Sequence, residues 1–353
     1  MLNKVEINSK VILKESKLNF VSNKSTSILD AGLNSNISLP HGCKSGNCGS
    51  CSVKLIEGKI KTFNGDIISK RSTNNNILLC QSFSYSEKII IQYPEEVLKK
   101  IDPNTSKSEV IVVKDYNVEV ISNKQVTPIV TELTISMPKK LNFRFDAGMH
   151  MDFINTELDI TKKYSICDEP DSKMNPHSHT LRFLIAKHNN NGLSSHLADK
   201  VFPGDIINIK GPYNSFIFNR LDESPIIALA GGTGIAPLIP ILEGFLCKNN
   251  ELYVMIVLSV RNRREILEMD VLYNMSQKYK NFSFKITLTR EKSFIGTRFL
   301  FGRIKKVLPK IFKDLSNHNI FICGSEGFIK HALETVTSLK AIQNNIHAEV
   351  FTS

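Results

Sequence analysis

Four of the seven cysteines lie in the first quarter of this 353-residue chain, and three of them share one short loop. Cys43, Cys48 and Cys51 have the spacing C-x4-C-x2-C, and Cys80 follows alone further along the chain. The intervening glycines allow the backbone to wrap around a compact group without clashes from Cβ atoms. An odd number of cysteines with a clustered subset predicts a metal or cluster site and leaves the remaining cysteines as bystanders.

The spacing is that of plant-type [2Fe–2S] sites, whose iron atoms are held by four cysteine thiolates. Peptide N–H groups of such a loop turn toward the sulfurs and tune the reduction potential, and Ser45 and Ser50 add hydroxyl donors. A structural zinc site is the alternative, but zinc sites more often pair two short C-x2–4-C knuckles. Because the fourth ligand stands alone here, we predict a [2Fe–2S] cluster bound by Cys43, Cys48, Cys51 and Cys80.

Basic residues outnumber acidic ones, 45 to 34, which gives a formal net charge of +11. The excess is spread along the chain and forms no basic run, so it predicts an ordinary solvated surface. A partner protein with an acidic docking face is the sharper alternative, because a positive field steers such a partner. No recognition motif for nucleic acid accompanies the charge. A hydrophobic content of 41% is enough to build cores, which excludes a disordered or fibrous chain.

No segment is expected to be a signal peptide or to span a membrane. Residues 1–20 are polar and of mixed charge, without the apolar core of a signal peptide. The segment from Pro225 to Cys247 is mostly apolar, but three prolines and four glycines interrupt it. This pattern predicts a strand, a glycine turn and the start of a helix, and we expect a cytoplasmic protein.

Three regions of different hydrophobic pattern follow one another. Up to residue 97, short apolar runs around one helical stretch predict a small α+β domain, and the polar, proline-marked residues 94–108 predict a linker. Residues 109–220 hold many short β-type runs, typical of a closed antiparallel barrel, and strands alternate with helices over 221–353, typical of a parallel sheet. In the first region, we expect a helix over Ser27–Leu33 and strands over Val53–Ile56 and Ile60–Phe63 across the Glu57-Gly58 turn.

Two short motifs between the predicted barrel strands have the residue types that hold a flavin. In the run from Lys162 to Ser165, a lysine ammonium can bind a phosphate of the flavin nucleotide. Tyr164 can cover the flavin ring, and Ser165 can form a hydrogen bond near the reactive nitrogen of that ring. Further along, Gly192 opens a hydroxyl-rich helix start that includes Ser195, which suits a pyrophosphate. An ordinary capped helix is the alternative for the second motif.

A glycine-rich turn follows the first strand of the third region. It runs from Ala230 to Pro237 and contains Gly231, Gly232, Thr233 and Gly234. The glycines permit close approach of a phosphate, and free N–H groups at the helix start bind it; a tight strand-to-helix turn is the alternative. Cys323 and Gly324 close another strand at the same predicted edge. Cys323 can lie beside a nicotinamide there, or be a small buried residue.

Together these motifs resemble the ferredoxin–NADP reductase superfamily with a plant-type ferredoxin domain fused in front. Its flavin motif Arg-x-Tyr-Ser is matched by Lys162, Tyr164 and Ser165, and its phosphate motif Gly-x-x-Ser by Gly192 and Ser195. Its nicotinamide motif Gly-Gly-x-Gly-x-Ala-Pro is matched by Gly231, Gly232, Gly234, Ala236 and Pro237. Its Cys-Gly motif is matched by Cys323 and Gly324. Phe351, after Glu349, matches the aromatic residue that stacks on the flavin in that family. There are two departures: Lys162 replaces an arginine and loses its fork, and Asn214 replaces a glycine of Gly-Pro-x-Gly-x-Phe.

The resemblance implies a multidomain α+β and α/β protein. It implies a β-grasp ferredoxin domain over residues 1–97, an antiparallel FAD-binding barrel over 109–220 and a Rossmann-like parallel-sheet nicotinamide domain over 221–353. It also implies an NAD(P)H-dependent oxidoreductase that passes electrons from NADH or NADPH through FAD and the cluster to a partner protein. Ser165 and Cys323 would tune the hydride step, and Tyr164 and Phe351 would enclose the flavin ring.

The electron acceptor has two candidates within this resemblance. The ferredoxin-first order is shared by reductases of multicomponent phenol, alkane and aromatic oxygenases and by the reductase that serves CDP-6-deoxyhexulose 3-dehydrase in dideoxysugar synthesis. Residues 25–51 are most similar to the sugar-pathway reductase, so that acceptor is predicted and an oxygenase is the alternative. A non-enzymatic metal- or nucleic-acid-binding module is a different class, and it would leave the glycine motifs unused.

The choice between NADH and NADPH depends on a basic turn after the second strand of the third region. Arg261, Arg263 and Arg264 follow the strand that ends near Ser259. Their guanidinium groups can meet a 2′-phosphate and favour NADPH. A solvated basic turn is the alternative.

Overall fold

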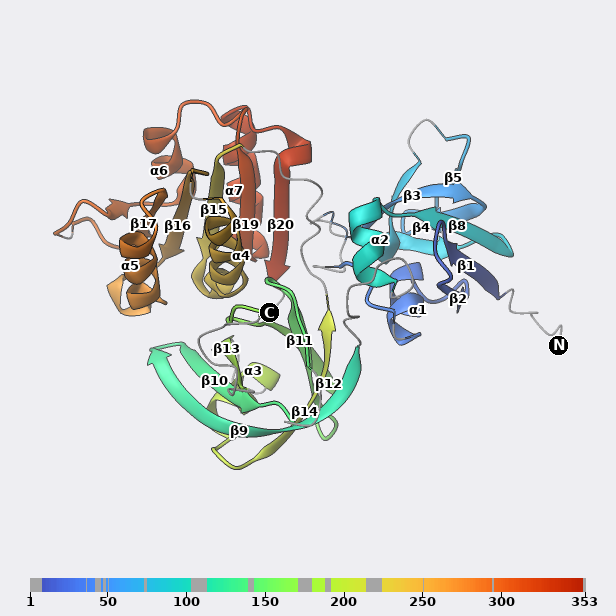
Figure 1. Cartoon of the computed structure of the whole chain (residues 1–353), viewed down its shortest axis with the longest axis horizontal. Coiled ribbons are helices and arrows are strands. Elements are labelled where there is room, and N and C mark those ends of the chain that lie inside the picture. Colours follow the sequence, from blue (N-terminus) through green and yellow to red (C-terminus); the bar gives the residue numbers. More distant parts are fainter. Residues whose placement is uncertain are drawn as a thin grey trace. The chain divides into compact units, whose positions relative to one another are not determined.

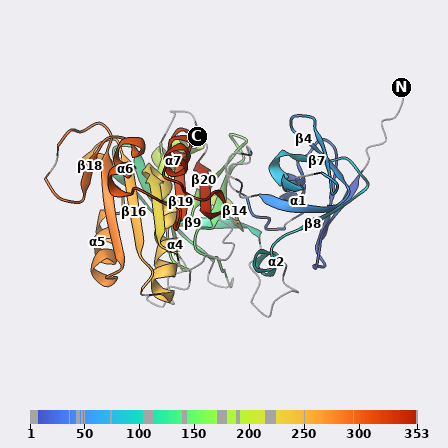
Figure 2. The ribbon, with the colours of Figure 1, turned by 90° about the horizontal axis from the view of Figure 1, so that it is seen from above.

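The computed structural model describes residues 8–35, 37–41, 46, 49, 51–72, 75–102, 113–138, 143–170, 180–187, 192–213, 224–249, 251–293 and 295–351 (Figure 1, Figure 2). The chain divides into two compact units. The first contains residues 1–114 and 212–220, and the second contains residues 115–211 and 221–353.

The first unit is an α+β arrangement of two small sheets and, in its described part, two short α-helices. A five-stranded sheet has the order β2-β1-β8-β3-β6, and a three-stranded sheet has the order β5-β4-β7. Helix α1 (Ile28–Asn34) begins at Ser27, whose hydroxyl accepts a hydrogen bond from the backbone N–H of Asp30, as the N-cap preference predicts. The strands are β1 (Ser9–Leu13), β2 (Asn19–Ser22), β3 (Ser52–Glu57), β4 (Lys59–Thr62), β5 (Ile67–Ser69), β6 (Asn76–Leu78), β7 (Ser82–Ser84) and β8 (Lys88–Gln92).

The turn at Glu57-Gly58 separates two sheets rather than joining a strand pair. Strand β3 pairs with β6 and β8, whereas β4 pairs with β5 and β7. Gly58 has φ +92°, and a Cβ there would lie 2.3 Å from the carbonyl oxygen of Lys88. The turn is therefore packed against the start of β8, and this packing needs glycine.

A helix, α2 (Glu95–Ile101), occupies the first half of the predicted linker. The prediction was wrong because the proline and the two acidic residues at its start suit a first helical turn as well as a linker. Three apolar residues, Val97, Leu98 and Ile101, are buried along it. The carboxylate of Asp102 then accepts hydrogen bonds from the Ser16 hydroxyl and from the Lys17 backbone N–H.

The second unit begins with a six-stranded sheet in the order β12-β11-β14-β9-β10-β13. The two strands at the ends of this order contact each other, so the sheet curls toward a barrel (Figure 1). The elements are β9 (Lys114–Thr127), β10 (Val130–Ser136), β11 (His150–Asn155), β12 (Ile160–Ser165), β13 (Thr180–Ala186), helix α3 (Leu193–Asp199) and β14 (Ile206–Tyr213). The predicted flavin motif at residues 162–165 lies on β12 itself, not between strands as expected.

A six-stranded parallel sheet in the order β18-β17-β16-β15-β19-β20 completes the second unit. The segment from Pro225 to Cys247 forms strand, turn and helix as predicted, and none of the helices in the described residues is long and apolar enough to cross a membrane. The elements are β15 (Ile226–Gly231), α4 (Ile235–Lys248), β16 (Val254–Val260), α5 (Met269–Lys278), β17 (Phe282–Leu288), β18 (Phe299–Phe301), α6 (Ile304–Ile311), β19 (Asn319–Ser325), α7 (Glu326–Ser338) and β20 (Ile346–Phe351).

Candidate active site

The glycine turn and Cys323 meet at the centre of the parallel sheet. Strand β15 lies between β16 and β19, and Ala230 is the register partner of Cys323. The chain passes from β15 to β16 on one side and reaches β19 on the other. In open parallel sheets, ligands bind at the carboxyl ends of the strands where the order reverses in this way. The predicted nucleotide residues therefore lie at the expected edge.

Two glycines of the turn differ in the space around them: Gly234 is tightly packed against backbone, and Gly232 faces open space. A Cβ at Gly234 would lie 2.1 Å from the carbonyl oxygen of Cys323, so this glycine packs the turn directly onto β19. Gly232 has φ +55°, and a Cβ there would have no heavy atom within 4 Å. The turn is thus closed on the protein side and open on the side that can receive a phosphate. Pro237 sits in the first turn of α4, where a missing N–H leaves no hydrogen bond unmade.

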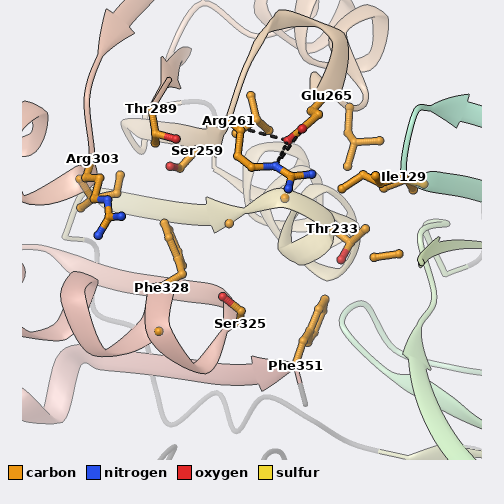
Figure 3. Close-up of a pocket in the computed structure, with 18 of the residues that line it drawn as sticks. Ile129, Thr233, Ser259, Arg261, Glu265, Thr289, Arg303, Ser325, Phe328 and Phe351 are labelled. Carbon is orange, nitrogen blue, oxygen red and sulfur yellow. Dashed lines mark hydrogen bonds and ion pairs between the residues drawn. The ribbon is translucent and has the colours of Figure 1, made fainter. Parts of the chain in front are cut away.

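A cavity of about 700 Å³ opens at this edge (Figure 3). Residues of the antiparallel sheet, such as Val130 and Ala186, line it together with Ile129 in the turn before β10 and with residues of the parallel-sheet half. The predicted flavin-stacking residue Phe351 also lines it. Other lining residues are Gly231, Gly232, Thr233, Ser259, Arg261, Glu265, Thr289, Arg303, Ser325, Phe328 and His331.

The basic turn is partly neutralised by acidic residues. Arg261 Nε lies 2.8 Å from a carboxylate oxygen of Glu265, and both side chains line the cavity (Figure 3). The backbone N–H of Arg263 donates a hydrogen bond of 2.7 Å to Glu291. Arg303, the residue immediately before α6, adds a second arginine to the cavity lining, and no motif in the sequence indicates it.

The two predicted hydride-step residues come from different sheets. Cys323 is fully buried on β19, and Ser165 is buried at the end of β12. Burial raises the pKa of the Cys323 thiol, the carboxylate of Glu349 raises it further, and Lys163 opposes the shift. The thiol is therefore neutral at pH 7, which disfavours a role as a nucleophile.

The hydroxyl of Tyr164 supports the flavin prediction. It is buried and has no hydrogen-bond partner among the residues that the structure describes. Burial also raises the pKa of Tyr164, so the hydroxyl keeps its proton. Buried hydroxyls are nearly always partnered, and this one fits a polar group of bound FAD. Phe153 holds the ring edge-to-face at a centroid distance of 5.1 Å.

The predicted phosphate motif of the flavin lies at the start of α3. Gly192 immediately precedes this short helix, and a Cβ at Gly192 would meet nothing within 4 Å. Ser195 is buried, and its backbone N–H bonds to the carbonyl of Gly192 at 3.0 Å. A phosphate contact at these two residues stays a prediction. Asn214 lies outside the described residues.

Half of the predicted cluster ligands can be placed. The Sγ atoms of Cys51 and Cys80 lie 3.3 Å apart in a buried site, which fits two thiolates that would hold one compact cluster. Gly46 and Gly49 have φ +86° and +74°, which fits a loop that wraps a compact group. Cys43 and Cys48 lie outside the described residues. Across the described ranges, groups of three or more His, Cys, Asp or Glu suited to a metal ion are absent.

Arg182 forms ion pairs with three carboxylates. Arg182 on β13 lies 2.8 Å from Glu132, 3.1 Å from Asp168 and 3.7 Å from Glu268. Glu268 belongs to the parallel-sheet half, immediately before α5, and has φ +53°. The cluster therefore joins the two sheets of the second unit. No local sequence pattern predicts it, because its members come from four separate segments.

Comparison with known proteins agrees with this geometry. Residues 11–84 match the model of the 2Fe-2S iron-sulfur cluster binding domain, and residues 228–334 match that of the oxidoreductase NAD-binding domain. The chain is 25% identical to reductase component 1 of terephthalate 1,2-dioxygenase from Comamonas sp., over 98% of both chains. It is 27% identical to the CDP-6-deoxy-L-threo-D-glycero-4-hexulose-3-dehydrase reductase of Yersinia pseudotuberculosis, over 97% of this chain and 98% of that one.

The solved structure of an Amycolatopsis cytochrome P450 reductase shares the fold, with a TM-score of 0.74 and 16% identity over 98% of this chain and 99% of that chain. The predicted multidomain fold class is thereby confirmed, with a 2Fe-2S domain ahead of a parallel-sheet NAD-binding domain, and a non-enzymatic binding module is not supported. The chain is an NAD(P)H-dependent iron–sulfur flavoprotein oxidoreductase in which a 2Fe-2S iron-sulfur cluster binding domain precedes an oxidoreductase NAD-binding domain.

Proposed function

We propose that this chain takes electron pairs from NAD(P)H and delivers single electrons to a partner enzyme. The cavity of the second unit carries this proposal, because the glycine turn and the antiparallel sheet line it together. FAD, when bound, supplies the change from two-electron to one-electron transfer. The three functional domains would be residues 1–97, 109–220 and 221–353.

Each candidate residue has a proposed role. Lys162, Gly192 and Ser195 would hold the phosphates of FAD, and Tyr164 and Phe351 would enclose its ring. Ser165 and Cys323 would tune the hydride step. Gly231, Gly232, Thr233, Gly234, Pro237 and Gly324 would bind the nicotinamide nucleotide, and Cys43, Cys48, Cys51 and Cys80 would hold the cluster.

The proposed acceptor is a CDP-6-deoxyhexulose 3-dehydrase, and an oxygenase component is the alternative. Both have support from similarity over nearly the whole chain to reductases with these names. The test is a reconstituted holoprotein with iron, sulfide and FAD, offered NADH or NADPH. We expect reduction of cytochrome c, and then turnover of the dehydrase but not of a terephthalate-type oxygenase. A holoprotein that reduces no one-electron acceptor would overturn the proposal.

A basic and apolar sheet face near Cys80 suits an acidic partner. We define this sheet face by Lys59, Lys61, Phe63 and Ile67, whose side chains are all exposed, Phe63 to 73%. Lys59 and Lys61 flank the fully buried Ile60 on β4, so both point outward. The backbone N–H of Phe63 bonds to the carbonyl of Gln81 at 2.9 Å, one residue beyond Cys80. A partner docked there would lie close to the proposed cluster.

We expect the double charge reversal Lys59→Glu, Lys61→Glu to lower kcat/KM for the acceptor about tenfold at low ionic strength, because steering by the field is reversed. The difference should shrink as salt is added. The measurement is acceptor reduction at a series of salt concentrations, with ferricyanide reduction unchanged. The matched control is Lys305→Glu, Lys330→Glu, at two exposed lysines of α6 and α7. Equal losses in both doubles would contradict an acidic docking face.

Glu265 should influence nucleotide choice. Its carboxylate holds Arg261 and would repel a 2′-phosphate in the same cavity. We expect Glu265→Gln to raise the ratio of kcat/KM for NADPH over that for NADH about fivefold, a charge effect of about 1 kcal/mol. Steady-state rates with both nucleotides measure it, with the exposed Glu251→Gln as control. An unchanged ratio would remove Arg261 from nucleotide discrimination.

A further inference from the structure

A buried ion pair joins the two sheets of the second unit beside the predicted hydride site. Glu349 on β20 has no exposed surface, and Lys163 on β12 is 16% exposed. Lys163 Nζ lies 3.6 Å from Glu349 Oε1. An isolated buried carboxylate is costly, and the Lys163 ammonium supplies the opposite charge at this distance. The pair is therefore a built feature of the interior and not a surface contact.

The positions of the two residues connect them to the predicted hydride site. Lys163 and Ser165 share one face of β12, because alternate residues of a strand point the same way. On the other sheet, Glu349 is the register partner of Cys323 and shares a face of β20 with Phe351. Phe351 in turn lines the nucleotide cavity. The charge pair thus links β12, the strand of Ser165, to β20, which lies beside the strand of Cys323.

The charges already act on a neighbour. Burial raises the pKa of the Cys323 thiol most; Glu349 raises it further and Lys163 lowers it, so both charges act at the residue beside which a nicotinamide would lie. His347, two residues before Glu349, adds no charge, because burial lowers its pKa to about 4. Together the lysine and the carboxylate have no net charge. Loss of either one would leave a single charge in a poorly screened interior.

We propose that Lys163 is a positioning residue of the hydride-transfer site, which balances the charge of Glu349 and fixes β12, with Ser165, against β20, with Phe351. This inference rests on the proposed function, since it presumes that FAD and the nicotinamide meet beside Ser165 and Cys323. A single negative charge there would disfavour the reduced, electron-rich flavin. A single positive charge would favour it.

The test uses the FAD-loaded full-length protein in equilibrium with a dye of known potential. We expect Lys163→Met to lower the fraction of reduced flavin, and Glu349→Gln to raise it, each by at least about threefold in the reduced-to-oxidised ratio. The double variant should return close to wild type, because it again has no net charge. Lys163→Arg should keep the wild-type ratio. Lys210→Met is the control, since Lys210 pairs with Asp115 at 3.9 Å elsewhere in the same sheet.

A second readout separates positioning from binding. We expect Lys163→Met to slow hydride transfer in stopped-flow reduction by about tenfold, with an unchanged Kd for NAD(P)H and unchanged FAD content. Shifts of the reduced-to-oxidised flavin ratio in the same direction in both single variants, or a double variant whose ratio stays away from that of wild type, would overturn the role of Lys163.

If wild-type protein with bound FAD is not reduced by NAD(P)H, the proposed function fails, whereas the dye equilibrium still reports on Lys163.

Discussion

Gly234→Ala is expected to abolish nucleotide-dependent reduction, with a loss of at least about a hundredfold in activity. The added Cβ would lie 2.1 Å from the carbonyl oxygen of Cys323, a backbone atom that no side-chain rotation can move. The glycine turn must therefore separate from β19, which displaces the phosphate-facing N–H groups and Cys323 together. We also expect a loss of about 3 kcal/mol in the free energy of unfolding, as for other overpacked interiors.

The control is another glycine of the same region. Gly244 lies within α4, and a Cβ there would meet nothing within 4 Å. Gly244→Ala is therefore expected to keep activity and to stabilise the helix by about 0.5–1 kcal/mol. Chemical denaturation and steady-state rates with NAD(P)H measure both variants. Wild-type activity in Gly234→Ala would show that the turn does not need its close contact with β19.

Cys80→Ala is expected to abolish electron transfer through the cluster while electron transfer from NAD(P)H to the flavin continues. Loss of one thiolate from the buried pair with Cys51 should prevent stable cluster binding, because cluster binding and local folding are coupled. We expect the reduction of cytochrome c to fall at least about a hundredfold, while ferricyanide reduction through the flavin stays within about twofold of wild type. The iron content, the visible spectrum and both rates are the measurements.

Cys247→Ala is the matched control, because Cys247 is exposed and contacts the Tyr279 hydroxyl at 3.0 Å, in the unit without the cluster. It should leave iron content and both rates unchanged. A Cys80→Ala protein with a full complement of iron and sulfide would remove Cys80 from the ligand set and reopen the assignment of the fourth ligand.

The sequence predicts those parts of the site that lie in short, continuous motifs. The glycine turn between β15 and α4 could be recognised because an apolar strand, a glycine-rich turn and a helix follow one another. Gly324 follows Cys323 at the end of a buried strand, so this motif was placed at the correct edge by the same reasoning. The cap at Ser27 likewise depends only on residues within one turn of α1.

Elements with mixed local signals were misjudged. Strand β12 reads Ile-Thr-Lys-Lys-Tyr-Ser, and its cations hide the alternation that marks a strand. The helix α2 was taken as linker because only its tertiary contacts explain why Leu98 and Ile101 are buried. Pairs such as Lys163 and Glu349 meet only after two sheets have formed. No spacing in the chain encodes such a meeting.

The three-carboxylate cluster around Arg182 has a thermodynamic consequence. Its members come from β10, β13, the segment after β12 and the residue before α5. If either sheet opened alone, several half-buried acids would lose their common cation and compete for protons. Partial opening is thus disfavoured beyond the loss of apolar contacts. The two sheets of this unit should melt as a single cooperative block, despite their separate hydrogen-bonded ladders.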